Sequence, residues 1–262
     1  MTLWVRFESG FGVLSGDAIA VHAGDMLGAN AATGEVRNLA DTRLLAPVQP
    51  GKFIGLWNNF HAVAARTGQP APNFPLYFLK ATSSIIGPDD GFRAPPNYDG
   101  KVVYEGELGV VIGSRCFNVS EAEASAHIFG YTCVNDITAA DLFFSVDPEF
   151  PSFPQWARAK GCDGFGPIGP VIATGIDPMG AAVKVALNGR ERQNYPLSDM
   201  ILPPARIVSL LSREMTLHPG DLIACGTSIN ALPMRPGMVV EVSIEGIGGL
   251  RNHYLTDVAQ AS

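Results

Sequence analysis

The chain has 262 residues, of which 47% are hydrophobic and 16% charged, so it can bury a sizeable core and intrinsic disorder is not expected. The formal net charge is −7 and the sequence has no basic cluster, which argues against nucleic acid as a partner. No signal pattern opens the chain and no apolar run approaches about 18 residues, which argues against membrane insertion and favours a cytoplasmic location.

Residues 1–48 are expected to form a small separate β domain. The segment "WVRFESGFGVLSGDAIAVHAG" alternates roughly between apolar and polar residues and is interrupted by glycines, a pattern typical of short β-hairpins. The stretch "PVQPGK", rich in proline and glycine, marks the predicted boundary. Residues 49–262 are then expected to form the larger domain.

The segment after this boundary predicts a strand, a short helix and a second strand. Residues Lys52–Leu56 predict an apolar strand. Asn58 or Asn59 is expected to cap the helix, which stops at Gly68. "LYFLKA" then predicts a strand, and the turn-rich loop "GPDDGFRAPPNYDG" follows it.

The central block is the most regular part of the sequence. "KVVYEGELGVVIG", bounded by Gly100 and Gly113, predicts one strand of about ten residues. A Ser–Glu capping box at Ser120 predicts a helix that runs to about Gly130. "YTCVND" then predicts a further strand.

The last third of the chain predicts two hairpins and a helix. The hairpin "AVKVALNGRERQNY" is expected to turn at Asn188-Gly189, and "PPARIVSLLSREMTL" has the periodicity of an amphipathic helix. "GDLIACGTS" and "GMVVEVSIEGIGGLRNHY" predict the closing strands. Short strands, hairpins and a few helices together predict a β-rich α+β fold.

Two glutamates of the central block, Glu105 and Glu107, are the first candidates for chemistry. Side chains at i and i+2 of a strand point to one face, with Cα atoms roughly 6.5 Å apart. Their neighbours are apolar, so two like charges here lose hydration and repel each other unless a cation lies between them. A hard cation such as Mg²⁺ prefers carboxylate oxygens and keeps positions open for a substrate. The alternative is an exposed edge strand on which both glutamates are solvated.

Asp136 and Lys160 are two further candidates. Asp136 ends "YTCVND", and on its own it is better explained as the N-cap of the following turn. Lys160 lies in "WARAKGCDGFGPIGP", whose glycines, prolines and aromatic residues predict a rigid loop around a pocket, although an isolated lysine is normally on the surface. Beside an enolate, this lysine would hold its charge or move a proton. Neither the cysteines nor the histidines have metal-ligand spacing, which argues against a zinc hydrolase.

Five segments together resemble the fumarylacetoacetate hydrolase superfamily. They are "GPDDGFRAPPNYDGKVVYEGELGVVIG", "IFGYTCVNDITAAD", "ARAKGCDGFGPIGP", "LNGRERQ" and "MTLHPGDLIACGTS". The match extends from about Gly51 to Tyr254. Its ordered set of E-x-E, N-D, K-G-C-D and P-G-D followed by G-T makes the resemblance specific.

The resemblance implies a mixed β-roll with a smaller N-terminal domain, usually in a homodimer. It also implies a site for Mg²⁺, or sometimes Mn²⁺ or Ca²⁺, that is held by three carboxylates: Glu105, Glu107 and Asp136. Lys160 matches a lysine beside the metal and the substrate, while Gly226 and Thr227 match a loop that receives a substrate carboxylate. Activities of the superfamily include cleavage of acylpyruvates, decarboxylation of oxaloacetate-like acids and isomerisation of hydroxymuconate-type dienes in aromatic catabolism. All of them begin with a 2-oxo acid bound to the metal and use an enolate.

The chain departs from the superfamily pattern at the residues that activate water. His61 matches the histidine of the lid helix, but Ala64 stands where a glutamate orients it in hydrolytic members, and Trp57 replaces an asparagine. Ala140 and Phe143 replace an arginine and a glutamine that contact the substrate, and "DLFFSVDPEFPSFPQW" makes the pocket wall more aromatic. These departures disfavour hydrolysis of the fumarylacetoacetate type.

The leading hypothesis is a metal-dependent enzyme that isomerises or decarboxylates a 2-oxo or 2-hydroxydienoic (di)acid through an enolate. Lys160 and His61 are its candidate catalytic residues. One alternative is metal-dependent hydrolysis of a C–C bond in an acylpyruvate-like substrate, with water activated by His61 and another acid. A second alternative is a degenerate member that binds metal and carboxylate without turnover. Each hypothesis predicts a small acid as the ligand.

Overall fold

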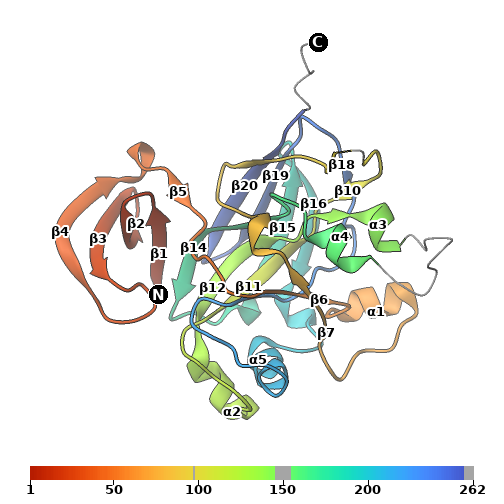
Figure 1. The fold of residues 1–262 in the computed structure, drawn as a ribbon, viewed down its shortest axis with the longest axis horizontal. Helices are drawn as coiled ribbons and strands as arrows, with labels where there is room; N and C mark the ends of the chain where they lie inside the picture. The colour runs from red at the N-terminus through yellow and green to blue at the C-terminus, as the bar shows by residue number, and fades with distance from the viewer. Residues whose placement is uncertain (97, 145–154, 257–262) are drawn as a thin grey trace.

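The computed structural model describes residues 1–96, 98–144 and 155–256, and strands predominate over helices within them (Figure 1). The largest sheet has the spatial order β4-β3-β2-β1-β14-β12-β11-β17-β6-β7, with β5 beside β1 and β8 beside β14. Its strands are β1 (Thr2–Phe7), β2 (Gly10–Ser15), β3 (Ala18–Gly24), β4 (Asn30–Asn38), β5 (Leu44–Leu45), β6 (Phe53–Trp57), β7 (Leu76–Lys80), β8 (Ile85–Ile86), β11 (Gly106–Ile112), β12 (Ile128–Asn135), β14 (Gly166–Thr174) and β17 (Leu222–Ala224).

Two smaller sheets and several short helices complete the described part of the chain. The sheet of order β13-β10-β18 contains β10 (Val102–Val103), β13 (Thr138–Ala139) and β18 (Pro233–Met234). The sheet of order β16-β15-β19-β20-β9 contains β9 (Gly91–Phe92), β15 (Ala182–Leu187), β16 (Arg190–Pro196), β19 (Val239–Ile244) and β20 (Gly248–Tyr254). The α-helices are α1 (His61–Thr67), α2 (Glu121–Ala124), α3 (Ala140–Phe144), α4 (Trp156–Lys160) and α5 (Pro204–Ser212). The 3₁₀ helices are η1 (Leu39–Asp41), η2 (Thr82–Ser84), η3 (Ser125–His127), η4 (Pro178–Gly180) and η5 (Leu197–Asp199).

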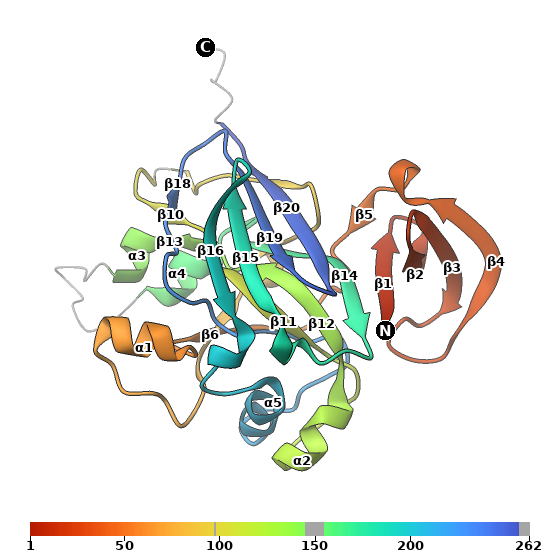
Figure 2. The same cartoon turned by 180° about the vertical axis from the view of Figure 1, so that it is seen from behind.

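The first four strands form an antiparallel meander at one side of the molecule, as both views of the ribbon show (Figures 1 and 2). The hairpins expected near the N-terminus are therefore present. β1 also pairs with β14, so the meander is continuous with the largest sheet. The division into residues 1–48 and 49–262 as separately folding domains stays a prediction.

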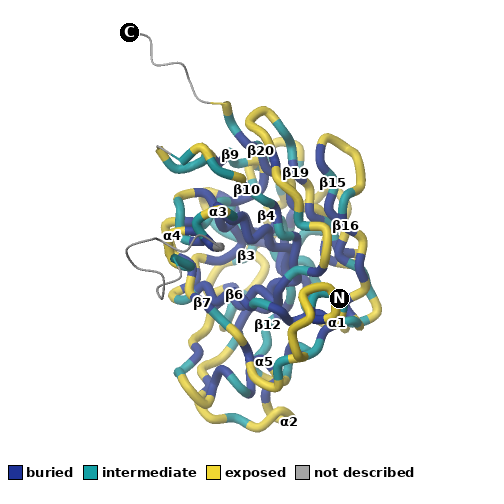
Figure 3. The backbone as a smooth tube through the Cα atoms, turned by 90° about the vertical axis from the view of Figure 1, so that its right-hand side faces the viewer, coloured by how far each residue is buried: buried dark blue, intermediate teal, exposed yellow. Residues whose placement is uncertain are grey.

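β11 is the strand that places one of the predicted ligands in the core. It is buried along its whole length, between β12 and β17 in its own sheet and against β15 and β19 of the five-stranded sheet. A Cβ atom on Gly106 would overlap Val185, so a glycine at this position lets the two sheets approach each other. Figure 3 shows the buried backbone concentrated in the middle of the molecule, where β6 and β12 are labelled.

The segment bounded by Gly100 and Gly113 forms two strands, so the single strand expected there was wrong. β10 pairs with β13 and β18, whereas β11 pairs within the largest sheet. Between them, the N–H of Glu105 donates to Asn135 Oδ1 over 3.0 Å instead of joining a strand ladder. The chain changes from one sheet to another here, and Glu105 lies at the change.

The helix predicted to run from Ser120 to about Gly130 is also shorter than expected. Its capping box is confirmed, but α2 ends at Ala124, and after η3 the strand β12 begins at Ile128. Residues 128–135 extend the ladder with β11, and this long-range pairing outweighs the local preference for helix.

Neither Asn58 nor Asn59 caps α1, which corrects the expected start of this helix. The N-cap residue is Phe60, whose side chain makes no capping hydrogen bond. The N–H of Ala62 instead donates to Asp199 Oδ2 over 3.1 Å. A residue distant in the sequence therefore does the work expected of a local cap. The end of the helix at Gly68 is as predicted, with φ +66°.

Other expectations are confirmed. Asn188 and Gly189 both have positive φ, as a two-residue hairpin turn between β15 and β16 requires. α5 forms as an amphipathic helix with a buried face, although it ends at Ser212, before the end of the predicted segment, and the β-rich α+β class holds. Among the described residues, no helix combines the length and the apolar character needed to cross a membrane.

Candidate metal and substrate site

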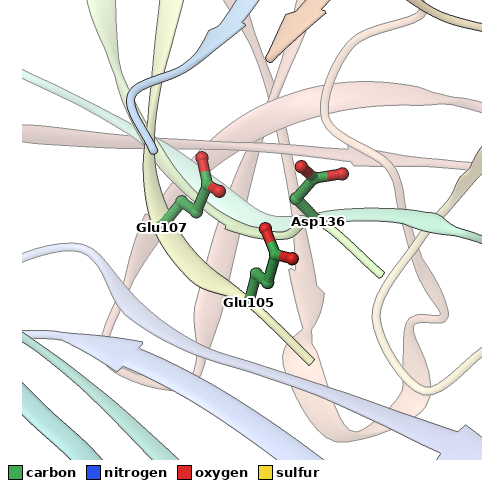
Figure 4. A group of neighbouring side chains, drawn as sticks. All are labelled: Glu105, Glu107 and Asp136. Carbon is green, nitrogen blue, oxygen red and sulfur yellow. The ribbon is translucent and has the colours of Figure 1, made fainter. Parts of the chain in front are cut away.

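Three carboxylates from separate elements converge beside β11 (Figure 4). Glu105 lies between β10 and β11, Glu107 lies in β11, and Asp136 directly follows β12. One oxygen of each lies within 4.8 Å of the others, which is a spacing that a single cation can bridge. The pairing of β11 with β12 brings Asp136 close to the two glutamates, because Gly106 lies opposite Asn135, the neighbour of Asp136.

The peptide between the two glutamates is held by two residues of β16, Gln193 and Tyr195, and by Thr227, which follows β17. The carbonyl oxygen of Gly106 accepts hydrogen bonds from the hydroxyls of Tyr195 and Thr227, the latter over 3.0 Å. The N–H of Gly106 donates to Gln193 Oε1 over 3.4 Å. These bonds fix the backbone from which the two glutamate side chains project.

Two buried lysines neutralise part of the charge of the cluster. Lys160 Nζ lies 2.5 Å from Asp136 Oδ2 and 2.8 Å from Glu105 Oε2. Lys80 Nζ lies 2.5 Å from Asp136 Oδ1, and its side chain is fully buried. Lys160 was expected in a loop but is the last residue of the helix α4.

Lys80 was not among the site residues predicted from the sequence. The available signal was a lysine at the end of the apolar strand "LYFLKA". A lysine in such a position is buried only when it has a partner, but the sequence alone does not identify Asp136 as that partner.

Electrostatics keep one lysine charged and leave one glutamate poorly stabilised. Burial disfavours the ammonium of Lys160, but the nearby carboxylates Asp136 and Glu105 outweigh it and raise its pKa. Burial lowers the pKa of Lys80, and Asp136 opposes that shift. Burial raises the pKa of Glu107 well above its usual value, and the neighbouring carboxylates raise it further. Lys160 is therefore a fixed positive charge, whereas Glu107 has no ion-pair partner among the described residues.

The environment of Glu107 fits a bound divalent cation. Its Oε2 accepts the N–H of Gly226 over 2.7 Å, but its buried Oε1 has no hydrogen-bond partner among the described residues. An unsatisfied buried polar group costs about 1–3 kcal/mol, and more when it is charged. Three carboxylates and two lysines leave one negative charge, which a divalent cation converts to one positive charge. The all-oxygen donor set suits Mg²⁺, Mn²⁺ or Ca²⁺.

A cavity of about 320 Å³ opens beside this cluster. Glu105 and Lys160 line it on one side, and its other walls include apolar side chains and the loop 227–232. Phe143 lines it and packs on Trp156 with ring centroids 4.3 Å apart, and Phe78 lies with its ring centroid 4.9 Å from Lys160 Nζ. The wall is aromatic, as expected, although residues 145–154 of the predicted aromatic segment lie outside the described residues.

Of the other predicted site residues, His61, Gly226 and Thr227, one lines the cavity. His61 begins α1, is exposed and is not among the residues that line the cavity, whereas Thr227 lines it. Gly226 donates its N–H to Glu107, so it supports a predicted ligand. The catalytic role of His61 and the substrate contacts of Gly226 and Thr227 stay predictions.

Two further residues shape the loop over the cavity and were not singled out in the sequence. Gln193 Nε2 donates to Thr227 Oγ1, and also to the carbonyl oxygens of Ser228 and Ile229 over 3.2 and 3.0 Å. Asn59 binds the carbonyl oxygens of Leu202 and Cys225 at 3.1 and 2.8 Å, which ties the start of α1 to the end of β17. The signal for Gln193 was its place in "LNGRERQ", and Asn59 gave none beyond its expected cap.

Asn58, which lines the cavity, has left-handed backbone geometry with φ +58°. Its buried Oδ1 has no hydrogen-bond partner among the described residues. Because glycine adopts this conformation freely and alanine does not, we expect Asn58→Gly to exceed Asn58→Ala in free energy of unfolding by about 1 kcal/mol. Chemical denaturation of the two variants measures the difference. Equal stabilities would contradict a backbone constraint at this position.

Comparisons with known proteins identify related sequences and structures. The family model described as fumarylacetoacetate (FAA) hydrolase, C-terminal, matches residues 52–254, and a model described as Rv2993c-like, N-terminal, matches residues 4–47. Protein Rv2993c of Mycobacterium tuberculosis is 41% identical over 223 residues, which cover 84% of this chain and 81% of that protein.

Two solved structures are similar over nearly the whole chain. The 2-hydroxyhepta-2,4-diene-1,7-dioate isomerase from Mycobacterium marinum is 36% identical with a TM-score of 0.85, covering 97% of this chain and 98% of that one. The fumarylacetoacetate hydrolase from Exiguobacterium antarcticum is 31% identical with a TM-score of 0.85, covering 98% of this chain and 100% of that one. The similar enzymes thus include both an isomerase and a hydrolase.

Proposed function

The chain belongs to the fumarylacetoacetate hydrolase family, and on that premise we propose that it is a divalent-metal-dependent enzyme acting on a 2-oxo or 2-hydroxydienoic acid. The proposed reaction is isomerisation, by tautomerisation, or decarboxylation through an enolate. The observation that carries the proposal is the juxtaposition of three converging carboxylates with Lys160, at one wall of a cavity large enough for a small acid.

The residues of the cluster have distinct proposed roles. Glu105, Glu107 and Asp136 hold the metal, while Lys80 and Lys160 fix the two oxygens of Asp136. A divalent cation bound there supplies Lewis acidity that stabilises negative charge on the 2-oxo oxygen. Lys160 lines the cavity and keeps its proton, so we assign it the stabilisation of the enolate from the protein side.

Tautomerisation is favoured over hydrolysis by the surroundings of α1. Hydrolysis needs a base that activates water, and His61 is exposed, outside the cavity lining, with Ala64 in place of an orienting glutamate. Hydrolysis of a C–C bond is the second candidate, and the likeness to a solved fumarylacetoacetate hydrolase favours it. The homodimer implied by the family, a small 2-oxo acid as ligand, and the lack of nucleic-acid and membrane partners also stay proposals.

Proton NMR with Mg²⁺ tests the proposed reaction. The purified protein is incubated in deuterated buffer with oxaloacetate, an acylpyruvate and a 2-hydroxydiene diacid, each with and without EDTA. We expect deuterium exchange beside the keto group, or loss of CO₂, that EDTA abolishes and that no acyl cleavage accompanies.

The other outcomes assign the alternatives. Pyruvate together with a free acid would place hydrolysis first. Absence of turnover with every substrate, combined with metal and acid binding by calorimetry, would favour a protein that binds without catalysis. Exchange that persists in EDTA would contradict the proposed requirement for a divalent metal.

A further inference from the structure

Arg66 is the charged residue lining the cavity that the cluster does not account for. Among the described residues, the charged side chains that line the cavity are Glu105, Lys160 and Arg66, and the first two are paired with each other. Arg66 lies in the last turn of α1 and is exposed. No ion pair or hydrogen bond of its guanidinium is found among the residues that the structure describes.

The cavity that Lys160 and Arg66 both line also has a largely apolar lining. Trp57, Val63, Phe78 and Phe143 all contribute to it. Such a wall accepts a hydrocarbon chain, whereas the charged ends of a ligand need polar partners. The cavity thus offers the charged groups of the cluster, apolar side chains that suit the hydrocarbon part of a ligand, and a separate guanidinium.

We propose that Arg66 binds a second carboxylate at the far end of the substrate, so that the enzyme selects dicarboxylic 2-oxo acids over those with an uncharged end. This inference rests on the proposed function, in which the first carboxylate and the 2-oxo group lie at the cluster. The planar guanidinium matches a carboxylate with two parallel hydrogen bonds, which a lysine does not reproduce. Lys160 does not serve this second carboxylate, because two of its three N–H groups already contact Asp136 and Glu105 and the third is assigned to the enolate.

A simpler explanation makes Arg66 a surface residue that favours the C-terminal end of α1 through the helix dipole. That role affects the stability of the helix by tenths of a kcal/mol and is indifferent to the ligand. The two explanations therefore differ in whether the effect of Arg66 depends on the far end of the ligand.

Matched pairs of ligands separate the two explanations. 2-Oxopentanedioate and 2-oxopentanoate differ only in the distal carboxylate, as do 2-oxoheptanedioate and 2-oxoheptanoate. Calorimetry with Mg²⁺ present gives each dissociation constant, and proton NMR in deuterated buffer gives KM and kcat for exchange beside the keto group. The proteins are the wild type, Arg66→Gln, Arg66→Lys and a control, Arg158→Gln, which removes the same charge from an exposed residue of α4 outside the cavity lining.

We expect Arg66→Gln to raise the dissociation constant and KM of the diacids at least about tenfold, the effect of losing a charge-assisted contact. The monoacids should bind equally well to both proteins, and kcat should change little. Arg66→Lys should restore part of the diacid affinity, and Arg158→Gln should match the wild type. Added salt should weaken diacid binding by the wild type more than by Arg66→Gln.

Two contrary outcomes are distinguishable. If diacids and monoacids bind in the presence of Mg²⁺ but Arg66→Gln affects them alike, Arg66 does not recognise the distal group and this inference is wrong. If no member of either pair binds or exchanges with any protein, the proposed function is wrong, and the inference that rests on it is wrong as well.

Discussion

Replacing Lys80 with methionine is expected to lower the free energy of unfolding by about 3–5 kcal/mol, measured by chemical denaturation in the presence of a chelator. The ammonium is fully buried and contacts Asp136 Oδ1 at 2.5 Å and the carbonyl oxygen of Ile137 at 3.3 Å. Methionine has a similar length but no charge, so the fully buried Asp136 keeps Lys160 as its one cationic partner among the described residues. A carboxylate left partly uncompensated in the interior causes the loss.

Two further variants isolate this effect. Arg251→Met breaks an exposed ion pair with Asp89 and should lower the free energy of unfolding by less than about 1 kcal/mol. The double variant Lys80→Met/Asp136→Asn removes the charge that Lys80 compensates, so it should be more stable than Lys80→Met alone. Similar losses for Lys80→Met and Arg251→Met would show that the buried pair contributes no more than a surface pair.

Only part of the convergence of the carboxylates could be predicted from local sequence patterns. The i, i+2 spacing of Glu105 and Glu107 predicts side chains on one face, whereas Asp136 alone is better explained as an N-cap, and its place beside the glutamates was implied by the resemblance to the family. The structure brings all three together, although β11 begins only after Glu105. The hairpin turn was also predictable, because the preference of Asn188 for positive φ is a property of the residue itself.

The parts that could not be predicted depend on contacts between distant segments. Lys80 contacts a residue 56 positions away, and nothing in the local sequence distinguishes Asp136 from other acids as its partner. The break before β11 arises because β10 joins a different sheet, and residue periodicity is the same on both sides of such a break. Asn59 is a suitable helix cap by type, but carbonyl groups from 143 and 166 residues away take its amide instead.

Glu107→Gln is expected to abolish turnover while stabilising the metal-free protein. The glutamine oxygen retains the hydrogen bond from Gly226, and its amide places donors where Oε1 of Glu107 has no described partner, near two other carboxylates. Loss of an anionic ligand weakens the metal site, which supplies several kcal/mol of transition-state stabilisation, so turnover should fall about a thousandfold or more. Metal at a hundred times its dissociation constant should stabilise the wild type by about 2.7 kcal/mol, and this gain should be largely lost in the variant.

The same charge argument predicts how the free energy of unfolding of the metal-free protein changes with pH, measured in the presence of a chelator. Burial raises the pKa of the Glu107 carboxyl in the folded protein above its ordinary value of 4.5. The folded state therefore binds the proton more tightly than the unfolded chain, and the stability that this provides is lost as the pH rises above 4.5 toward the raised pKa. The free energy of unfolding of Glu107→Gln should accordingly exceed that of the wild type by more as the pH rises. The control Glu8→Gln, at an exposed position, should show no such trend. A variant that loses turnover but gains no stability at any pH would mean that Glu107 is already compensated without a metal, and the charge argument for a cation at this site would fail.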